Sequence, residues 1–295
     1  MTREKEIYRV TIIGGVSNAL LVAFKFVAGI VGNSSAMVAD AVHSLSDFLT
    51  DILVLVFVRI SSKPQDKSHD YGHGKYETIA SFIIALGLLA VAIGIIVGGA
   101  KKFALWLQGG DLAAPGKIAL WAALLSIVVK ELLYQYTIRC GKAIESQVLV
   151  TNAWHHRSDA VSSVGAALGI GGALLLGERW AVLDPIAGVV IGAMLVKTSI
   201  DLVRGSMDDL TDGSLPEEME HEILQIINSV PDVIDPHNLR TRRIGNHIAI
   251  EVHIRMSGAT PLHEAHERAS LIESKLRERF GSHTHVSVHM EPIKD

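Results

Sequence analysis

The chain has 295 residues, of which 49% are hydrophobic and 20% charged, and its formal net charge is −4. This length allows one large domain or two small ones. A weakly acidic chain lacks the basic face that nucleic acid binding requires, so we expect no nucleic acid partner. Cys140 is the single cysteine, which excludes a disulfide framework within the chain and a cysteine-based zinc finger.

Apolar runs of roughly 20 residues, the length that crosses a bilayer, follow one another through the first two thirds of the chain. They predict six membrane-spanning helices, near residues 10–31, 36–58, 78–107, 117–138, 150–176 and 181–203. The first run is long and is followed by more spans. It is therefore expected to remain in the protein instead of acting as a signal peptide.

Lysine and arginine predict the orientation of these spans. An even number of spans places both termini on the same side of the membrane, where about nine basic residues lie against about four opposite. The positive-inside rule then places both termini in the cytoplasm. We expect a membrane domain at 1–206 and a cytoplasmic domain at 207–295.

The second domain has the pattern of a small α+β fold. Segment 214–216 opens a helix that runs to about Ser229, because proline suits a first helical turn. Strands at 239–244 and 247–256 flank a Gly245–Asn246 turn, and in the second strand apolar and polar residues alternate. A helix from 260–261 to about Phe280 and a strand at 285–291 complete an α-β-β-α-β order, which predicts a sheet with helices on one face.

The second span carries a stripe of ionisable residues. Asp40, His43, Asp47 and Asp51 share one helical face. Each such group costs on the order of 2.5–3.5 kcal/mol at the bilayer centre, so the stripe needs a partner or a water-filled path. His43 and Asp47 are the candidate ligands, whereas Asp40 and Asp51 are expected to line the access path.

The fifth span supplies a matching pair. His155 and Asp159 are four residues apart and can point at the same ion, whereas His156 is expected to pack beside them. Two facing pairs offer two imidazole nitrogens and two carboxylate oxygens, a tetrahedral set that suits Zn²⁺. Mg²⁺ and Ca²⁺ prefer more oxygens, and Mn²⁺ leans the same way. The alternative is a polar network that only holds the bundle together, and the presence of pairs on two spans favours metal.

The loop after the second span contains Asp66, His69 and His73. These residues offer the ligand types of a second, partly exposed metal site. The spacing fits a solvated polar loop equally well, so the residues alone leave both interpretations open.

The last strands of the chain place histidines on shared faces. His253, His289 and Glu291 are expected to converge, which favours a further metal site. The segment from His263 to His266 is one residue short of the zinc-protease motif, so its two histidines do not share a helical face. We therefore reject a metalloprotease.

Several segments together resemble the cation diffusion facilitator family of metal/proton antiporters, in particular its bacterial dimeric zinc transporters. They read HSLSD, HHRSD, HDYGHGKYE and VVKELLYQY, with DPHNLRTR, IEVHI and VSVHMEP in the tail. The resemblance covers nearly the whole chain. It implies a homodimer in the lipid bilayer, each chain a six-helix membrane domain followed by a ferredoxin-like, metallochaperone-like cytoplasmic domain.

The resemblance also implies four groups of site residues. The transport site would be His43, Asp47, His155 and Asp159. The loop site would be Asp66, His69 and His73. A cytoplasmic metal cluster would draw on His237, His253, His266, His289 and Glu291. A charged interlock where the two domains meet would form between Lys75, Asp212 and Arg242.

The function implied is export of zinc from the cytoplasm in exchange for protons, with Zn²⁺ also a regulatory or structural ion, by a transporter and not an enzyme. Some bacterial members of this family have Asp at the position of His43. At the position of Glu291, Asp is more usual in the family. The short loop between spans four and five favours a prokaryotic inner membrane protein.

Alternative functions are export of Fe²⁺, Co²⁺ or Mn²⁺, or metal sensing at the membrane without transport. An intramembrane metalloenzyme is disfavoured, because four protein ligands leave no open position for water.

Overall fold

The computed structural model describes residues 3–61, 63, 65–143, 147–245 and 247–293, without the side chains of 3–8, 50–61, 147–148, 151 and 178. Two compact units divide the chain. The first, here the helical unit, comprises Met1–Ile52 and Ile84–Asp201. The second, here the tail unit, comprises Leu53–Ile83 and Leu202–Asp295.

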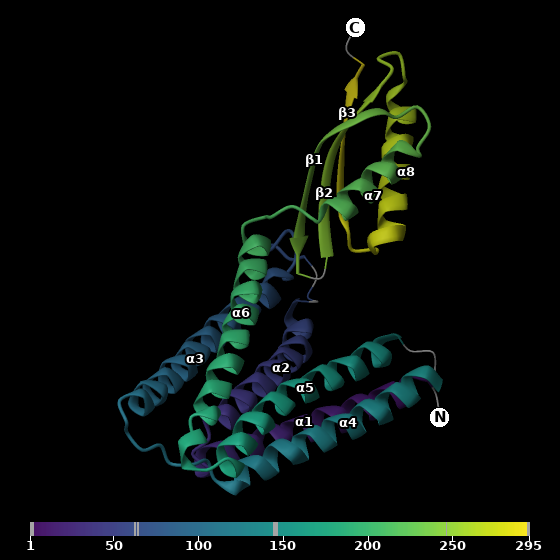
Figure 1. Ribbon diagram of the computed structural model, residues 1–295. Coiled ribbons are helices and arrows are strands. Elements are labelled where there is room, and N and C mark those ends of the chain that lie inside the picture. Colours follow the sequence, from purple (N-terminus) through teal and green to yellow (C-terminus); the bar gives the residue numbers. More distant parts are fainter. Residues whose placement is uncertain (1–2, 62, 64, 144–146, 246, 294–295) are drawn as a thin grey trace. The chain divides into compact units, whose positions relative to one another are not determined.

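In the described part of the chain, six long helices precede the tail domain, as the apolar runs predict (Figure 1). They are α1 (Arg3–Val31), α2 (Ser35–Ser61), α3 (Lys75–Leu107), α4 (Lys117–Ala143), α5 (Gln147–Leu175) and α6 (Leu183–Leu210), with a 3₁₀ turn η1 (Glu178–Trp180) before α6. Five of them, α1 and α3 to α6, are long and apolar enough to cross a membrane. In α2 the side chains are described only from Ser35 to Leu49, which is shorter than a span. The prediction of a helical membrane domain is confirmed.

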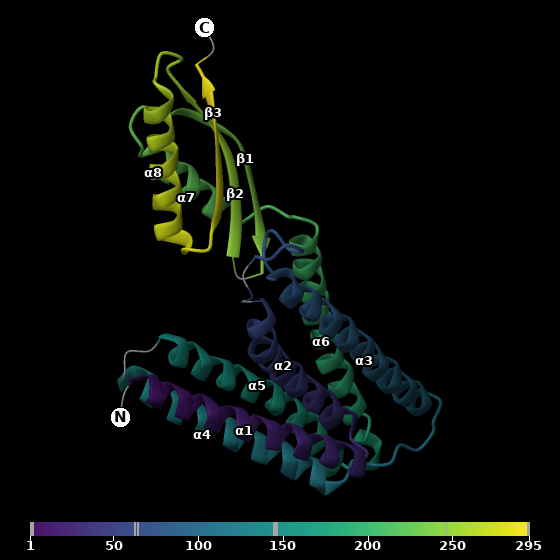
Figure 2. The same cartoon turned by 180° about the vertical axis from the view of Figure 1, so that it is seen from behind.

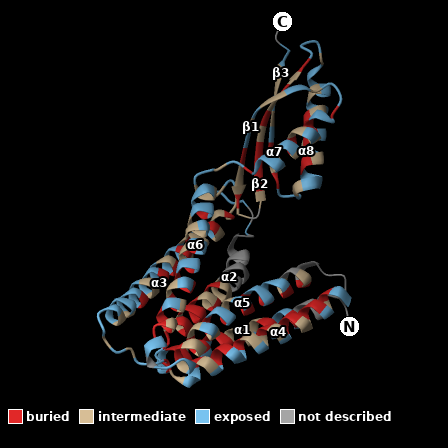
Figure 3. Ribbon diagram, viewed as in Figure 1, coloured by how far each residue is buried: buried red, intermediate tan, exposed pale blue. Residues whose placement is uncertain are grey.

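Small side chains build the core of the helical unit. In both views α1, α4 and α5 run alongside one another (Figures 1 and 2). The buried core residues from these helices and from α2 and α3 are mostly alanines, and they appear red where the helices meet (Figure 3). They include Ala28, Ala36, Ala39, Ala92, Ala119, Ala122, Ala123 and Ala166. Such residues let helix backbones approach closely in a membrane, where packing and not hydrophobicity drives association.

The start of α2 is held by a buried carboxylate from α6. Asp184 accepts hydrogen bonds from the Ser34 hydroxyl at 2.5 Å and from the Ser35 backbone N–H at 2.7 Å. A carboxylate at a helix N-terminus satisfies free N–H groups and complements the helix dipole. This contact fixes α6 against the beginning of the helix that carries His43 and Asp47.

The tail domain contains α7 (Glu217–Asn228), β1 (Ile234–Ile244), β2 (His247–Met256), α8 (Leu262–Phe280) and β3 (His285–Pro292). The sheet order is β1-β2-β3, with β1 antiparallel and β3 parallel to β2. Both helices cover the same face of the sheet (Figures 1 and 2), where the apolar side chains of β2 form the core with α7 and α8. The α+β fold with helices on one face is therefore confirmed.

β1 is longer than its sequence suggests. It begins at Ile234 instead of 239, and its pairing with β2 is irregular on both sides of His237. Asp235 and Asn238 have φ of 48° and 49°, the left-handed conformation that Asp and Asn tolerate. Bulges of this kind interrupt the alternation from which strands are predicted. Asn246, predicted in the following turn, lies outside the described residues.

Candidate metal centres

The strongest candidate site in the helical unit lies between α2 and α5. His43, Asp47 and Asp159 each offer one ligand atom, and these atoms lie within 4.8 Å of one another. Asp159 is 3% exposed. Within the described part of the chain, the buried Oδ2 of Asp47 has no hydrogen-bond partner. A buried carboxylate oxygen without a partner is costly, and a cation at this point would satisfy it.

His155, the fourth predicted ligand, stands beside this group and not in it. Its Nε2 lies 3.8 Å from Oδ1 of Asp159, one helical turn away, and its side chain is 50% exposed. The structure thus brings three of the four predicted transport-site residues together, with the fourth touching one of them. The four-ligand set stays a prediction.

Lys130 occupies a position that the sequence analysis missed. From α4, its Nζ lies 2.6 Å from Oδ2 of Asp159, and both side chains are nearly fully buried. A lysine inside an apolar span is itself a signal, because such residues pair with other groups and mark functional sites. Its partner cannot be predicted from the sequence alone, because Lys130 and Asp159 lie on different helices and are 29 residues apart in the chain.

Asp40 does not line an access path, so that prediction was wrong. Its side chain is fully buried, and its Oδ2 lies 2.7 Å from Nζ of Lys25 on α1. The same ammonium donates to the hydroxyls of Ser44 and Ser163 at 2.9 Å. A charge inside a bundle needs such compensation, and Lys25 provides it here. The side chain of Asp51 lies outside the described residues.

His156 packs as expected beside the predicted ligands. It is 2% exposed, and a Cβ atom added to Gly14 of α1 would lie 3.4 Å from its Nε2. Neither ring nitrogen has a hydrogen-bond partner among the described residues.

In the tail unit, Asp66, His69 and His73 form a second group whose ligand atoms lie within 4.8 Å of one another. The Asp66 carboxylate lies 3.5 Å from Nδ1 of His69 and 3.5 Å from Nε2 of His73. Hydrogen bonds from the hydroxyl and N–H of Ser68 hold the pKa of the Asp66 carboxyl well below its usual range. The buried Nδ1 of His73 has no partner in the described residues. Two imidazoles and one carboxylate fit zinc.

The predicted charged interlock assembles next to this loop. Nζ of Lys75 lies 2.6 Å from Oδ1 of Asp212, and Nη1 of Arg242 lies 3.6 Å from its Oδ2. The Arg242 guanidinium also lies over the ring of Tyr71, 4.8 Å from its centroid. A pocket of about 460 Å³ is lined by these residues together with His69 and His73.

A third group lies on the open face of the tail sheet. His237, His253 and His289 are register neighbours on β1, β2 and β3. Glu291 joins them, since its carboxylate lies 3.0 Å from Nδ1 of His253, 3.4 Å from Nε2 of His237 and 3.8 Å from Nε2 of His289. The hydrogen bond with His253, and then the nearby imidazoles, lower the pKa of Glu291. Of the five predicted residues, His237, His253 and Glu291 form the tight group.

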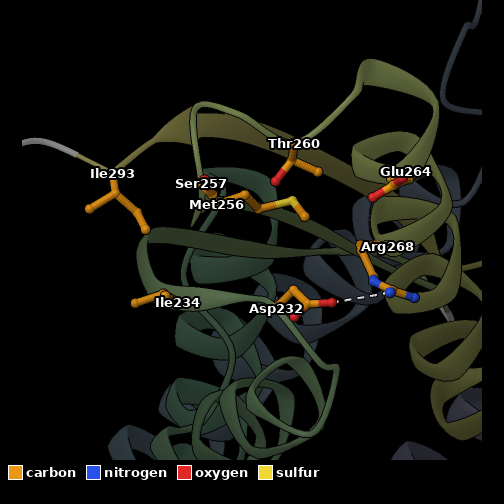
Figure 4. A pocket seen from close by; sticks show the side chains of 8 residues that line it. All are labelled: Asp232, Ile234, Met256, Ser257, Thr260, Glu264, Arg268 and Ile293. Atoms are coloured by element: carbon orange, nitrogen blue, oxygen red, sulfur yellow. Dashed lines mark hydrogen bonds and ion pairs between the residues drawn. The ribbon is translucent and has the colours of Figure 1, made fainter.

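His266 is the member of the predicted cluster that the structure leaves apart. It is exposed on α8. That helix packs through Ala269, Ile272 and Leu276 onto the apolar face of the sheet, opposite the histidine face. A further pocket of about 310 Å³, beside the Asp232–Arg268 ion pair (Figure 4), is lined by none of the predicted ligands.

Long apolar helices with a group of nitrogen and oxygen ligands between them, a second such group in the loop between α2 and α3, and a third in the small domain that follows define a multi-pass membrane protein of the metal-handling class. Residues 11–211 match the cation efflux transmembrane domain, and residues 215–293 match the cytoplasmic domain of cation efflux proteins. The chain therefore belongs to the cation diffusion facilitator family, which confirms the resemblance. It is a metal efflux transporter, and members of this family are transporters and not enzymes.

Two full-length relatives cover nearly the whole chain. An uncharacterised transporter of Methanocaldococcus jannaschii is 34% identical over 275 residues, covering 92% of this chain and 94% of that protein. The manganese efflux system protein MneP of Bacillus subtilis is 32% identical over 294 residues, covering 98% and 97%. Among solved structures, the metal-bound C-terminal domain of the CzcD transporter from Thermotoga maritima matches with a TM-score of 0.25 and 29% identity, covering 26% of this chain and 91% of that domain.

Proposed function

We propose that this chain exports zinc from the cytoplasm in exchange for protons. The observation that supports this most is the convergence of the ligand atoms of His43, Asp47 and Asp159, within 4.8 Å of one another, between two helices of the membrane domain. With His155 rotated in, the donors would be two nitrogens and two oxygens, the tetrahedral set that Zn²⁺ prefers.

Exchange of metal for protons follows from the chemistry of these ligands. Imidazole and carboxylate bind a metal only when deprotonated, so metal and protons compete for the same groups. A zinc ion that enters from the cytoplasm displaces protons, and protons that return from the other side help to release it. Rocking of helices around a fixed central site then gives alternating access.

The tail would act as a cytoplasmic, dimerising domain in this scheme. We place the division between membrane and cytoplasmic domains near 206–207, both termini in the cytoplasm, and a homodimer in the inner membrane of a prokaryote. His237, His253 and Glu291 would hold a regulatory or structural zinc ion, which the two imidazoles and one carboxylate suit. Asp66, His69 and His73 would hold another.

Manganese is the second candidate cargo. The relatives MneP and MneS of Bacillus subtilis, 32% and 30% identical, are named manganese efflux system proteins. Oxygen-rich sites favour Mn²⁺, whereas imidazole favours zinc, so His43 is the residue on which this choice depends. We propose zinc because His43 lies in the three-residue group.

The test is flux through the purified protein in liposomes. A metal-sensitive dye inside the vesicles would report entry of Zn²⁺, Mn²⁺, Fe²⁺ or Co²⁺, with and without a pH gradient. We expect zinc to enter fastest and its entry to require an opposing proton gradient. Replacement His43→Asp should shift preference toward Mn²⁺. If manganese flux exceeds zinc flux in the unaltered protein, the proposed cargo is manganese instead of zinc. If no metal is transported, a metal sensor is favoured.

A further inference from the structure

Among the described side chains of the helical unit, two lysines are buried, and their surroundings differ. Lys25 bonds Asp40, Ser44 and Ser163, so its ammonium has three partners on two neighbouring helices. Lys130 bonds Asp159 alone within the described part of the chain. The first lysine is a fixed part of the bundle, whereas a single contact holds the second.

This partner of Lys130 is one of the predicted metal ligands. Its Nζ lies 2.6 Å from Oδ2 of Asp159, while Oδ1 of the same carboxylate lies 3.8 Å from Nε2 of His155. The ammonium therefore neutralises the same carboxylate that a bound metal would use. While Lys130 remains there, a metal bound to Asp159 has to share the negative charge of this carboxylate with the ammonium.

The charges explain why a cation is needed here when no metal is bound. Ligand atoms of Asp47 and Asp159 lie within 4.8 Å of each other. Two carboxylates this close in a buried site repel each other and lose hydration. Lys130 neutralises one of them. An arriving divalent ion supplies two positive charges to the same pair, after which the ammonium is a repelled neighbour.

On these contacts, and resting on the proposed transport function, we propose that Lys130 is a tethered cation that occupies Asp159 whenever the transport site holds no metal. Metal and ammonium exchange on this carboxylate. Lys130 is thus a positioning residue that sets affinity, not a ligand. It weakens metal binding enough for the ion to leave, and it keeps the emptied site compensated while the carrier returns.

The proposal predicts an unusual split in the behaviour of Lys130→Gln. Removal of the competing charge should lower the Kd for zinc at the transport site by roughly 5- to 150-fold, the range of ordinary coupling between two ligands. It should also lower the maximal flux in liposomes, because release and return become slow. KM and kcat therefore fall together. Lys130→Arg keeps the charge and should stay close to the unaltered protein in both.

Isothermal titration of the full-length protein measures the first part, with the transport-site component defined as the zinc binding lost in Asp47→Asn. Lys102 is a matched control, since its Nζ bonds the Ser35 hydroxyl at the start of α2, at 3.0 Å. Lys102→Gln should leave the Kd unchanged. An equal or higher Kd in Lys130→Gln, or equal behaviour of the Arg and Gln variants, overturns the proposal.

A second measurement does not depend on the stability of a variant. In the unaltered protein with isotope-labelled lysine, the side-chain resonance of Lys130, assigned by its loss in Lys130→Arg, should shift in step with zinc binding. A resonance that does not move overturns the proposal while transport itself stands. If Asp47→Asn removes no zinc binding, the transport site fails, and the role of Lys130 fails with it.

Discussion

Gly74 and Gly245 approach each other so closely that a Cβ atom on Gly245 would lie 2.5 Å from the carbonyl oxygen of Gly74. Gly245 has φ of 64°, a conformation that glycine adopts without strain. Gly74 directly follows the loop ligand His73, and Gly245 directly follows the last residue of β1. The loop group is therefore seated against a hairpin of the tail sheet, with both parts inside the tail unit.

Gly74→Ala should displace the loop that carries the ligand His73 from the tail sheet. The added methyl group would collide with the backbone carbonyl of Ile244, which cannot rotate away as a side chain can. Overpacking of this kind costs about 1–3 kcal/mol. We expect a lower Tm and weaker metal binding by the loop group. Gly258→Ala is the control, since its Cβ would meet Pro292 at an ordinary 3.7 Å. Equal Tm values for the two variants would contradict this view of the contact.

The ion pair of Lys75 and Asp212 should make stability depend on pH. The hydrogen bond from Lys75 lowers the pKa of Asp212, so the folded pKa lies below the unfolded one. The stabilisation is then fully present above the unfolded pKa of about 3.9, and it is lost as pH falls through the lower folded pKa. Since an exposed pair contributes roughly 0–1 kcal/mol, Asp212→Asn should lower Tm by up to about 4 °C at pH 7.

That difference in Tm should shrink toward zero as the pH is lowered below about 3.9, since the wild-type carboxyl then becomes neutral too. Thermal unfolding of both proteins over this pH range is the measurement. A gap in Tm of the same size at every pH would mean that charge is not the cause.

Glu291→Gln should weaken metal binding by the tail. The change preserves size but removes the anionic group that contacts His253 at 3.0 Å and His237 at 3.4 Å. We expect the Kd for zinc at this cluster to rise at least about tenfold, the smallest loss commonly seen when even an outer partner of a ligand is removed. Titration of the variant against Glu278→Gln, exposed on α8, is the comparison. Indistinguishable curves would exclude Glu291 from the cluster.

The buried pair of Lys25 and Asp40 should behave as a unit. Lys25→Met leaves the Asp40 carboxylate buried without its partner, which costs about 3–5 kcal/mol. Adding Asp40→Asn removes the uncompensated charge and should restore part of that loss. Unfolding free energies of the two single variants and the double variant measure this coupling. Strictly additive losses would mean that the ion pair contributes no stability of its own.

Much of this architecture could be predicted from periodicity. The six apolar runs in the sequence correspond to six helices in the described part of the chain. The spacing of His43 and Asp47 placed both on one helical face, because helical geometry is local. The alternation in β2 likewise separated its apolar face from His253. Bulges around His237 concealed the start of β1, because a bulge breaks the period of two.

Contacts between helices could not be predicted in the same way. Asp40 was expected on an access path, and only the packing of α1 against α2 brings Lys25 to it. Lys130 lies in the VVKELLYQY segment of the sequence. Its contact with Asp159 on α5, however, depends on how the two helices are rotated against each other. His266 could not be excluded from the tail cluster until α8 was seen to cover the other face of the sheet.

The measurement that tests the central claim most directly is pH-driven zinc flux in liposomes that contain the unaltered protein, Asp47→Asn or Asp159→Asn. Both carboxylates are required if one ion binds between α2 and α5 on its way across. We predict that each variant keeps its oligomeric state and its fold, as judged by size-exclusion chromatography and Tm, and carries no zinc above empty vesicles. Flux at the wild-type rate in either variant would contradict the account.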